Sequence, residues 1–287
     1  MSWTLAITGK GGTGKTTLAA LAVRWLGEHG LGPVLAVDAD PNTCLDGLLG
    51  VRVAVAVGSV REEVRQIAQS LGTASGGASS GGMASTGMVS AGAVSTGGMG
   101  KQQLLEMKIQ QGLVECEDFD LIAMGRPEGP GCYCYANNVL SAAVRRLADS
   151  YRSVVIDNEA GLENLSRRIV RRVDQLVFMA DPSARGLRTA RQLYDLAVEM
   201  EIEAGQMSLI INRARDDGGL ERARSLFEGV PVVVAGWLPE DAELAKRDAD
   251  GEPVWTLPAE NAVYRAAAAV FARMTRSGDG QAKPRPA

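Results

Sequence analysis

The chain has 287 residues, a formal net charge of −4, 46% hydrophobic residues and only 5% aromatic residues. That length allows one large α/β domain or two small ones, and the composition predicts a core of Val, Ile, Leu and Ala, as in a buried parallel sheet. The acidic balance argues against a nucleic-acid partner. No apolar run approaches the ~20 residues that span a bilayer, and the first residues lack a signal-peptide pattern. We therefore expect a cytoplasmic protein with no nucleic-acid or membrane partner.

Short β-rich segments alternate with helical patterns along the chain. The pattern predicts strands at residues 3–8, 34–38, 119–124, 153–157, 175–180, 207–212 and 231–237, and helices at 15–28, 136–149, 162–172 and 184–201. Such alternation predicts an α/β fold with a mostly parallel sheet of seven or eight strands and helices on both faces. Ligands of such folds bind at the carboxyl ends of the strands.

One segment breaks this alternation. Residues 72–100 contain only Gly, Ala, Ser, Thr, Met and Val, so they carry no charge. This composition buries too little apolar surface to offset the entropy of ordering, and predicts a flexible insertion. A neutral linker is the favoured interpretation, and a soft-metal tether using Met83, Met88 and Met99 is the alternative. We also expect a disordered tail at residues 277–287, so that residues 1–276 form one domain.

Residues 9–17 read GKGGTGKTT and match the G-x-x-x-x-G-K-[ST] template of a phosphate-binding loop, or P-loop. They follow an apolar run and open a helical pattern, which is the context that this motif requires. The backbone N–H groups of such a loop and the helix N-terminus favour phosphate. Lys15 is expected to reach the β- and γ-phosphates of ATP and to act in catalysis, and Thr16 to bind Mg²⁺. The predicted nucleotide contacts in this loop are Gly11, Gly12, Thr13, Gly14, Lys15, Thr16 and Thr17.

A second lysine, Lys10, stands near the start of the loop. The pattern K-G-G-x-G-K-[ST] resembles the deviant Walker A loop of P-loop NTPases related to MinD, ParA and the nitrogenase iron protein. The resemblance implies a homodimer in which Lys10 reaches the partner's nucleotide and acts in catalysis, as an arginine finger does.

Two carboxylate-bearing segments fit the same family. LAVDADPN resembles its switch I, which implies that Asp40 orients the attacking water and that Asp38 supports the metal side. SVVIDNEAG resembles Walker B and switch II, with Asp157 reaching Mg²⁺ through water. Carboxylates at strand ends can instead be helix caps, an alternative that is strongest for Asp38.

Two later segments point to the base of the nucleotide. Asn212, in LIINR, lies where this family has an asparagine that recognises the base, and its amide offers adenine a donor and an acceptor. A turn asparagine is the alternative. The segment WLPED is similar to the one that closes over the base, which would place Pro239 in the nucleotide site.

Cys132 and Cys134 lie one residue apart in PGCYC. A disulfide, a redox site, a pair of buried thiols and a metal site are the four alternatives. A bond between them would close a strained ring, and a thioredoxin-like site has two intervening residues. Two thiolates fall short of the four ligands usual for a soft metal, but a twofold dimer would supply four.

The segments GRPEGPGCYCYANNVL, DNEAGLENLSRR and DPSARGLRTA, together with the P-loop, resemble the CooC-type ATPases. These accessory proteins help to insert nickel into carbon monoxide dehydrogenase. The resemblance implies that Cys132 and Cys134 of both subunits bind Ni²⁺ or Zn²⁺ across the dimer, and that carbon monoxide dehydrogenase is the client. ATP and Mg²⁺ complete the expected set of cofactors.

Two other functions compete with this one. A redox ATPase like the nitrogenase iron protein would hold a bridging [4Fe–4S] cluster through the same cysteines, but that branch uses two cysteines far apart in sequence and not a C-x-C pair. That branch also has an aspartate where this chain has Cys44, and since a thiol cannot hold Mg²⁺ in the same way, we leave Cys44 out of the site. A positioning ATPase like MinD or ParA would need an amphipathic C-terminal helix or a basic face, and the sequence after Arg276 shows neither. We expect Cys116 to be a core or helix-end thiol and His29 to have a structural role at a helix C-terminus.

Overall fold

The structure is a computed structural model, which describes residues 2–40, 42, 44–57, 107, 109–125, 145–162, 172–216 and 218–279. The predicted insertion at residues 72–100 lies outside the described residues. So do Cys132 and Cys134, and most of the two helices predicted at 136–149 and 162–172.

The described residues form an eight-stranded sheet in the order β3-β4-β2-β5-β1-β6-β7-β8. All pairs are parallel except β3 with β4. The prediction of a mostly parallel sheet is therefore confirmed. The strands are β1 (Trp3–Gly9), β2 (Val34–Asp38), β3 (Leu113–Glu115), β4 (Phe119–Ala123), β5 (Ser153–Asp157), β6 (Arg172–Ala180), β7 (Glu203–Ala214) and β8 (Val232–Pro239).

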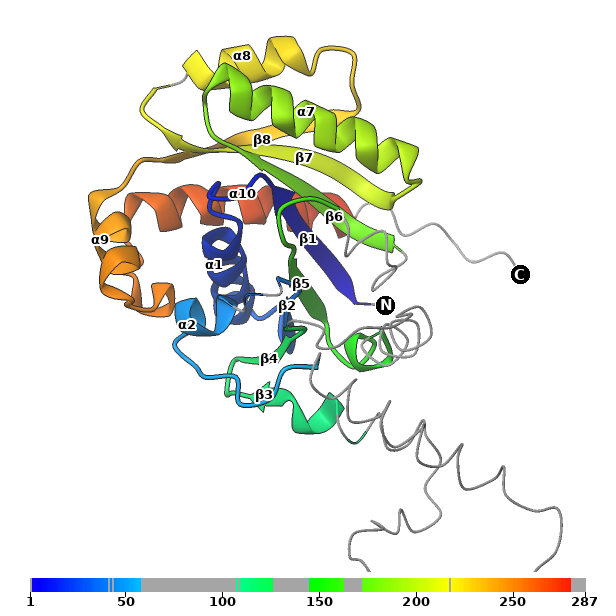
Figure 1. The fold of residues 1–287 in the computed structure, drawn as a ribbon, viewed down its shortest axis with the longest axis vertical. Helices are drawn as coiled ribbons and strands as arrows, with labels where there is room; N and C mark the ends of the chain where they lie inside the picture. Colours follow the sequence, from blue (N-terminus) through cyan, green and yellow to red (C-terminus); the bar gives the residue numbers. More distant parts are fainter. Residues whose placement is uncertain are drawn as a thin grey trace, which may run out of the picture.

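Helices cover both faces of this sheet. Helices α1 and α10 pack on one face, and α7 and α8 pack on the other (Figure 1). The helices with described bounds are α1 (Lys15–Glu28), α2 (Leu45–Leu49), α7 (Ala184–Glu199), α8 (Gly218–Leu226), α9 (Ala242–Asp250), the 3₁₀ turn η1 (Val254–Thr256) and α10 (Ala262–Asp279).

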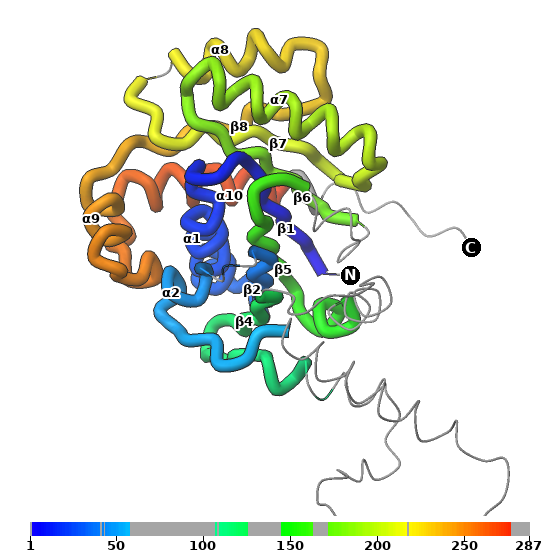
Figure 2. Tube along the Cα trace, viewed as in Figure 1, coloured from blue at the N-terminus to red at the C-terminus, as the bar shows by residue number. Residues whose placement is uncertain are grey.

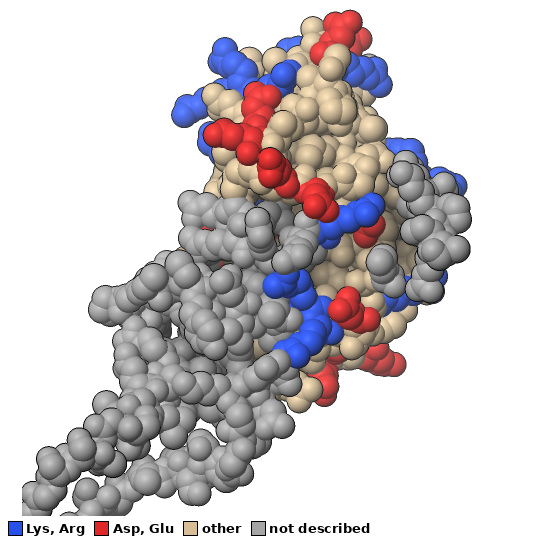
Figure 3. Space-filling view, turned by 90° about the vertical axis from the view of Figure 1, so that its right-hand side faces the viewer, with Lys and Arg blue, Asp and Glu red and all other residues tan. Residues whose placement is uncertain are grey.

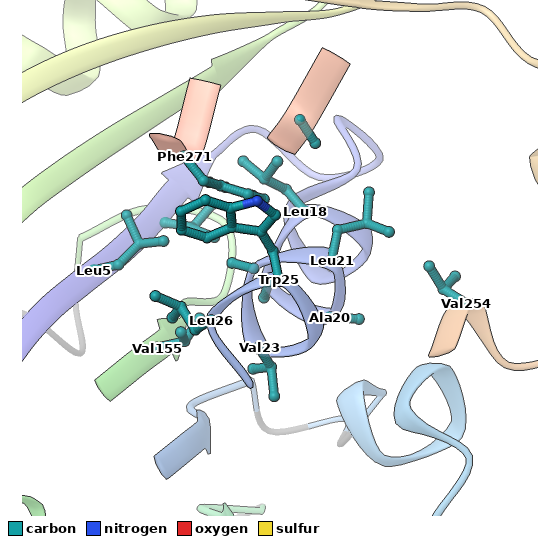
Figure 4. Close-up of a cluster of buried hydrophobic side chains, with 14 of the residues drawn as sticks. Leu5, Leu18, Ala20, Leu21, Val23, Trp25, Leu26, Val155, Val254 and Phe271 are labelled. Atoms are coloured by element: carbon teal, nitrogen blue, oxygen red, sulfur yellow. The ribbon is translucent and has the colours of Figure 1, made fainter. Parts of the chain in front are cut away.

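The alternation of side chains along β1 shows how one strand serves both layers. Leu5 and Ile7 face the cluster formed with α1 and α10, whereas Ala6 between them belongs to the cluster on the α7 side. In the α1 layer, Trp25 lies among aliphatic side chains, and its ring centroid is 5.8 Å from that of Phe271 (Figure 4). Both sides of β1 are therefore closed to water, and its exit into the P-loop has a fixed position.

Several elements differ from the predictions, and the helices α2, α8, α9 and α10 were not among those predicted. Strand β3 was not predicted, because three residues are too few to show an alternating pattern. Arg172 opens β6 and does not end a helix; it lies in register with Glu203 of the parallel neighbour β7. Helix α10 continues through Asp279, which includes the first three residues of the predicted tail, because its packed residue Met274 lies just over one turn from that end.

The surface gives little further information about partners. Acidic and basic side chains both occur on the face drawn in Figure 3, with uncharged residues between them. Among the described residues, no helix has the length and apolar character needed to cross a bilayer.

Candidate functional site

The predicted site residues of β1, β2 and β5 lie at the carboxyl edge of the sheet. The register pairs Asp157 with Ile7 of β1 on one side and with Asp38 of β2 on the other. Figure 2 traces these central strands side by side, with β1 leading through the P-loop into α1. The two carboxylates and the start of the loop therefore share one edge.

The carbonyl oxygen of Lys10 closes the P-loop. It accepts hydrogen bonds from Thr13 Oγ1 at 2.8 Å, from Thr13 N at 3.3 Å and from Lys15 Nζ at 3.3 Å. These three donors fix the backbone of Lys10, whereas the side chain of Lys10 is exposed. The loop's own hydrogen bonds therefore define the shape of its backbone.

Asn212 of β7 supports this loop from outside. Its Nδ2 donates to the carbonyl oxygen of Thr13 at 2.8 Å, and its Oδ1 accepts from the backbone N–H of Arg213 at 2.9 Å. Gly14 has φ +88°, and a Cβ at Gly14 would lie only 2.4 Å from Asn212 Nδ2. Asn212 is therefore a structural part of the loop as well as a candidate contact for adenine. Its amide retains a second N–H for that contact.

The segment predicted to close over the base lies on the neighbouring strand. Pro239 is the last residue of β8 and pairs in register with Ala214, two residues after Asn212. The structure thus brings Asn212 and Pro239 to the ends of adjacent strands, and their contact with a base stays a prediction.

Lys15 and Asp157 are buried charged groups of opposite sign. Burial lowers the pKa of Lys15, and the charges of Asp157, Asp40 and Glu159 oppose that shift. Burial raises the pKa of Asp157 to about 7, against the opposing effects of the Thr16 hydroxyl and Lys15. The Thr16 hydroxyl thus favours the charged form of Asp157. Within the described residues, neither carboxylate oxygen of Asp157 has a hydrogen-bond partner of normal geometry.

Unpartnered, buried carboxylate oxygens are unfavourable unless a ligand or cation compensates them. Mg²⁺ suits this arrangement, because it binds proteins through one or two carboxylates and takes its other ligands from phosphate and water. Within the described part of the chain, no group of three or more His, Cys, Asp or Glu residues could hold a metal ion alone. Asp157, Thr16 and Lys15 therefore fit a magnesium nucleotide better than a free metal ion.

Asp38 organises the switch I segment. Its carboxylate is fully buried and accepts backbone N–H groups from Asp40 at 3.0 Å, Cys44 at 2.9 Å and Leu45 at 3.0 Å. Burial raises the pKa of Asp38, and these hydrogen bonds oppose the shift. These contacts agree with the alternative that Asp38 caps a helix, because two of the N–H groups belong to Cys44 and Leu45 at the start of α2.

Asp40 is half-buried and differs from Asp38 in its contacts. Its Oδ1 accepts from the backbone N–H and the side-chain amide of Asn42, at 2.8 and 3.0 Å. These contacts hold one carboxylate oxygen of Asp40 against the residue two positions later in the segment.

Two residues that the sequence analysis did not single out join the P-loop strand to the segment after Asp157. The backbone N–H and the side-chain amide of Asn158 both donate to the Ile7 carbonyl oxygen, at 3.1 and 3.0 Å. The hydroxyl of the fully buried Thr8 donates to the carbonyl oxygen of Gly161. The only sequence signal was their position, since Thr8 precedes the loop and Asn158 follows Asp157.

Cys44 borders the candidate nucleotide site, whereas Cys116 and His29 lie outside it. Cys44 is exposed at the start of α2, and Cys116 is partly buried just after β3, so it is not at a helix end. His29 caps the C-terminus of α1, where its Nδ1 lies 2.8 Å from the carbonyl oxygen of Trp25 and its ring stacks on that indole. This is the expected structural place for His29.

We predict that Gly14→Ala lowers the thermal stability of the nucleotide-free protein, while Gly11→Ala leaves it nearly unchanged. A side chain at Gly14 meets Asn212 and has an unfavourable φ, whereas a Cβ at Gly11 meets nothing within 4 Å. The strain at Gly14 should cost about 1–3 kcal/mol. Thermal melts of both variants measure this difference, and equal melting temperatures would contradict the described loop.

We predict a pH-dependent gain in stability for Asp157→Asn, measured without nucleotide and with a chelator. The pKa of Asp157 is raised from its ordinary 3.8 to about 7, so the folded state binds more protons than the unfolded chain between these values. Its contribution to the free energy of unfolding therefore falls as pH rises through this window. The stability of the variant minus that of the wild type should grow from about pH 4 to about pH 7 and then level off. A difference that does not change with pH would refute the raised pKa.

Comparisons with known proteins agree with this geometry. The chain matches the CobQ/CobB/MinD/ParA nucleotide binding domain over residues 4–254. An uncharacterized ATP-binding protein of Methanocaldococcus jannaschii is 36% identical over 261 residues, which are 91% of this chain and 94% of that protein. The carbon monoxide dehydrogenase accessory protein CooC of Rhodospirillum rubrum is 30% identical over 206 residues, which are 69% of this chain and 70% of that protein.

Solved structures share the fold. The MinD cell division protein of Aquifex aeolicus has a TM-score of 0.64 at 19% identity, with all of both chains covered. The septum site-determining protein MinD of Pyrococcus horikoshii, solved with Mg-ADP, has a TM-score of 0.65 at 18% identity, and covers 99% of this chain and 100% of that one. The chain therefore belongs to the CobQ/CobB/MinD/ParA family of nucleotide-binding proteins, and it is an ATPase.

Proposed function

We propose that this ATPase is a metallochaperone of the CooC type, which binds nickel or zinc between the C-x-C loops of two subunits and serves carbon monoxide dehydrogenase. The observation that carries the proposal is the 30% identity to the CooC protein of Rhodospirillum rubrum, in a chain that contains Cys132 and Cys134. Two soft thiolates from each subunit would supply the four ligands that Ni²⁺ or Zn²⁺ takes in sulfur sites. The metal is the cargo, and ATP turnover is the activity of the carrier.

The described residues suggest how the chain would handle the nucleotide. Lys15 would neutralise the β- and γ-phosphates, and Thr16 and Asp157 would hold Mg²⁺, directly and through water. Bound magnesium would supply positive charge where the two Asp157 oxygens lack partners. Asp40, one carboxylate oxygen of which Asn42 holds, would orient the attacking water, while Asp38 holds the backbone of switch I.

The loop geometry also supports a role for Lys10 between subunits. Three hydrogen bonds to its carbonyl oxygen hold the backbone of Lys10, and its side chain remains exposed. A lysine so placed can extend from a fixed base toward a second chain. In a homodimer, Lys10 of each subunit would therefore stabilise charge on the partner's phosphates.

This function predicts different defects for the two lysines. Lys15→Ala should abolish nucleotide binding, because the buried amine is the loop's own phosphate ligand. Lys10→Ala should keep most nucleotide binding but weaken ATP-dependent dimerisation, so that it needs more protein, and lose most turnover. Nucleotide titration, analytical ultracentrifugation and phosphate release separate these effects. Full turnover by the Lys10 variant would refute a catalytic role across the dimer.

The proposed function also predicts one metal ion per two chains, because the proposed metal site lies on the twofold axis of the dimer. Protein purified without chelators and dialysed against Ni²⁺ or Zn²⁺ should bind this amount, and Cys132→Ser with Cys134→Ser should remove it while ATP binding persists. Serine keeps the size of cysteine but lacks the easily ionised sulfur. Cys44→Ser with Cys116→Ser is the matched control and should retain the metal.

Metal analysis also discriminates among the alternatives. Iron and sulfide with visible charge-transfer absorption would replace this proposal by a redox ATPase with a bridging [4Fe–4S] cluster. One tight metal per monomer, or full metal content in the Cys132/Cys134 double variant, would refute the shared site.

A further inference from the structure

A carboxylate that the proposed ATPase cycle has not used, that of Asp181, follows the strand next to the one that leads into Lys10. Strands β1 and β6 are parallel neighbours, and their register pairs Gly9 with Met179. The contact is close, since a Cβ at Gly9 would lie 2.5 Å from the Met179 carbonyl oxygen. Lys10 therefore leaves β1 at the level where β6 ends, and Asp181 is the first residue after β6.

The Asp181 carboxylate has a fixed position. Its Oδ1 accepts the backbone N–H of Ser183 at 2.9 Å, and Ser183 in turn caps α7 by accepting from Gly186 N at 3.0 Å. A Cβ at Gly186 would lie 2.6 Å from the carboxyl carbon and from each oxygen of Asp181. Gly186 thus makes room for this carboxylate at the start of α7, and the carboxylate cannot move toward the helix.

The charges of Asp181 and Lys10 act on each other in this arrangement. Burial alone would raise the pKa of Asp181, but the hydrogen bonds from Ser183 and the charge of Lys10 hold that pKa below its ordinary value. Lys10 has a fixed backbone and a long, exposed side chain, so its amine can approach Asp181 or turn away from it. Asp181 cannot follow, because Ser183 and Gly186 hold it.

We propose that Asp181 is a positioning residue for Lys10, which holds the amine near its own subunit until two subunits meet. This inference rests on the proposed role of Lys10 in the partner's site. Dimerisation would transfer the Lys10 amine from Asp181 to the phosphates of the partner's nucleotide. Because the pairing with Asp181 favours the monomer, Asp181 would raise the protein concentration at which ATP drives dimerisation.

The pairing itself is a property of the monomer and can be measured there. In nucleotide-free monomer, the Asp181 carboxyl is titrated by NMR in the wild type and in Lys10→Ala. Loss of the lysine should raise the pKa of Asp181. Lys246→Ala, which removes the same charge from exposed α9, should leave it unchanged. An Asp181 pKa that does not respond to Lys10→Ala would overturn the inference.

The effect on assembly is measured with Asp181→Asn, which keeps the size and the acceptor for Ser183 N–H but loses the charge. We expect the ATP-dependent dimer to form at lower protein concentration, by about two- to five-fold for each exposed pair released. Asp216→Asn is the matched control, because Asp216 Oδ1 accepts Gly218 N–H at the start of α8 in the same type of turn. Equal dimerisation of Asp181→Asn and the wild type would overturn the inference.

A double-mutant cycle separates pairing from a purely structural role of Asp181. In the Lys10→Ala background, Asp181→Asn should have no effect on the remaining dimerisation, whereas a structural role would give the same change in both backgrounds. If Lys10→Ala alone dimerises with ATP as the wild type does, the proposed role of Lys10 across the dimer fails. The monomer titration still decides whether Asp181 pairs with Lys10.

Discussion

The hydrogen bonding of β1 between β5 and β6 is the constraint on which the candidate site depends. Ile7 lies opposite Asp157, and Gly9 lies opposite Met179, so the P-loop starts between a carboxylate of one neighbour and the helix entry of the other. Asn158 and Thr8 strengthen the junction with β5 through the carbonyls of Ile7 and Gly161. A one-residue shift in either register would reverse the side chains of β1 and separate these groups.

Burial at this edge also sets the electrostatics. Lys15 and Asp157 both lose hydration, and each carries a pKa shifted by burial toward its neutral form. Their mutual attraction opposes both shifts but does not cancel them. These two groups therefore make the site less stable than a neutral one, and a magnesium nucleotide, which carries both signs of charge, would relieve both groups. Such conflicts between stability and function are common where chemistry takes place.

Several motif residues also maintain the backbone of the site. Asp38 binds three N–H groups of switch I, and Asn212 binds the P-loop at Thr13 while Gly14 leaves space for its amide. A residue with such contacts holds loops in place before any ligand arrives, which reduces the reorganisation needed on binding. When such a residue is replaced, activity can fall because a ligand contact is lost or because the loop is no longer held in place. Measurements of stability separate these two causes.

The sequence alone determined the parallel α/β fold, the P-loop and the strand-end position of Asp38 and Asp157, because periodicity and short motifs are local properties of the chain. It did not reveal the short edge strand β3, nor that Arg172 belongs to a strand opposite Glu203. Only the tertiary structure placed the end of β6, which leads into Asp181, next to the end of β1, which leads into Lys10. It also brought Asn212 to Thr13, Asn158 to Ile7 and Thr8 to Gly161. These three hydrogen-bonded contacts join residues from about 150 to 200 positions apart, and strand order and register, which depend on the packing of the whole sheet, decide which residues meet.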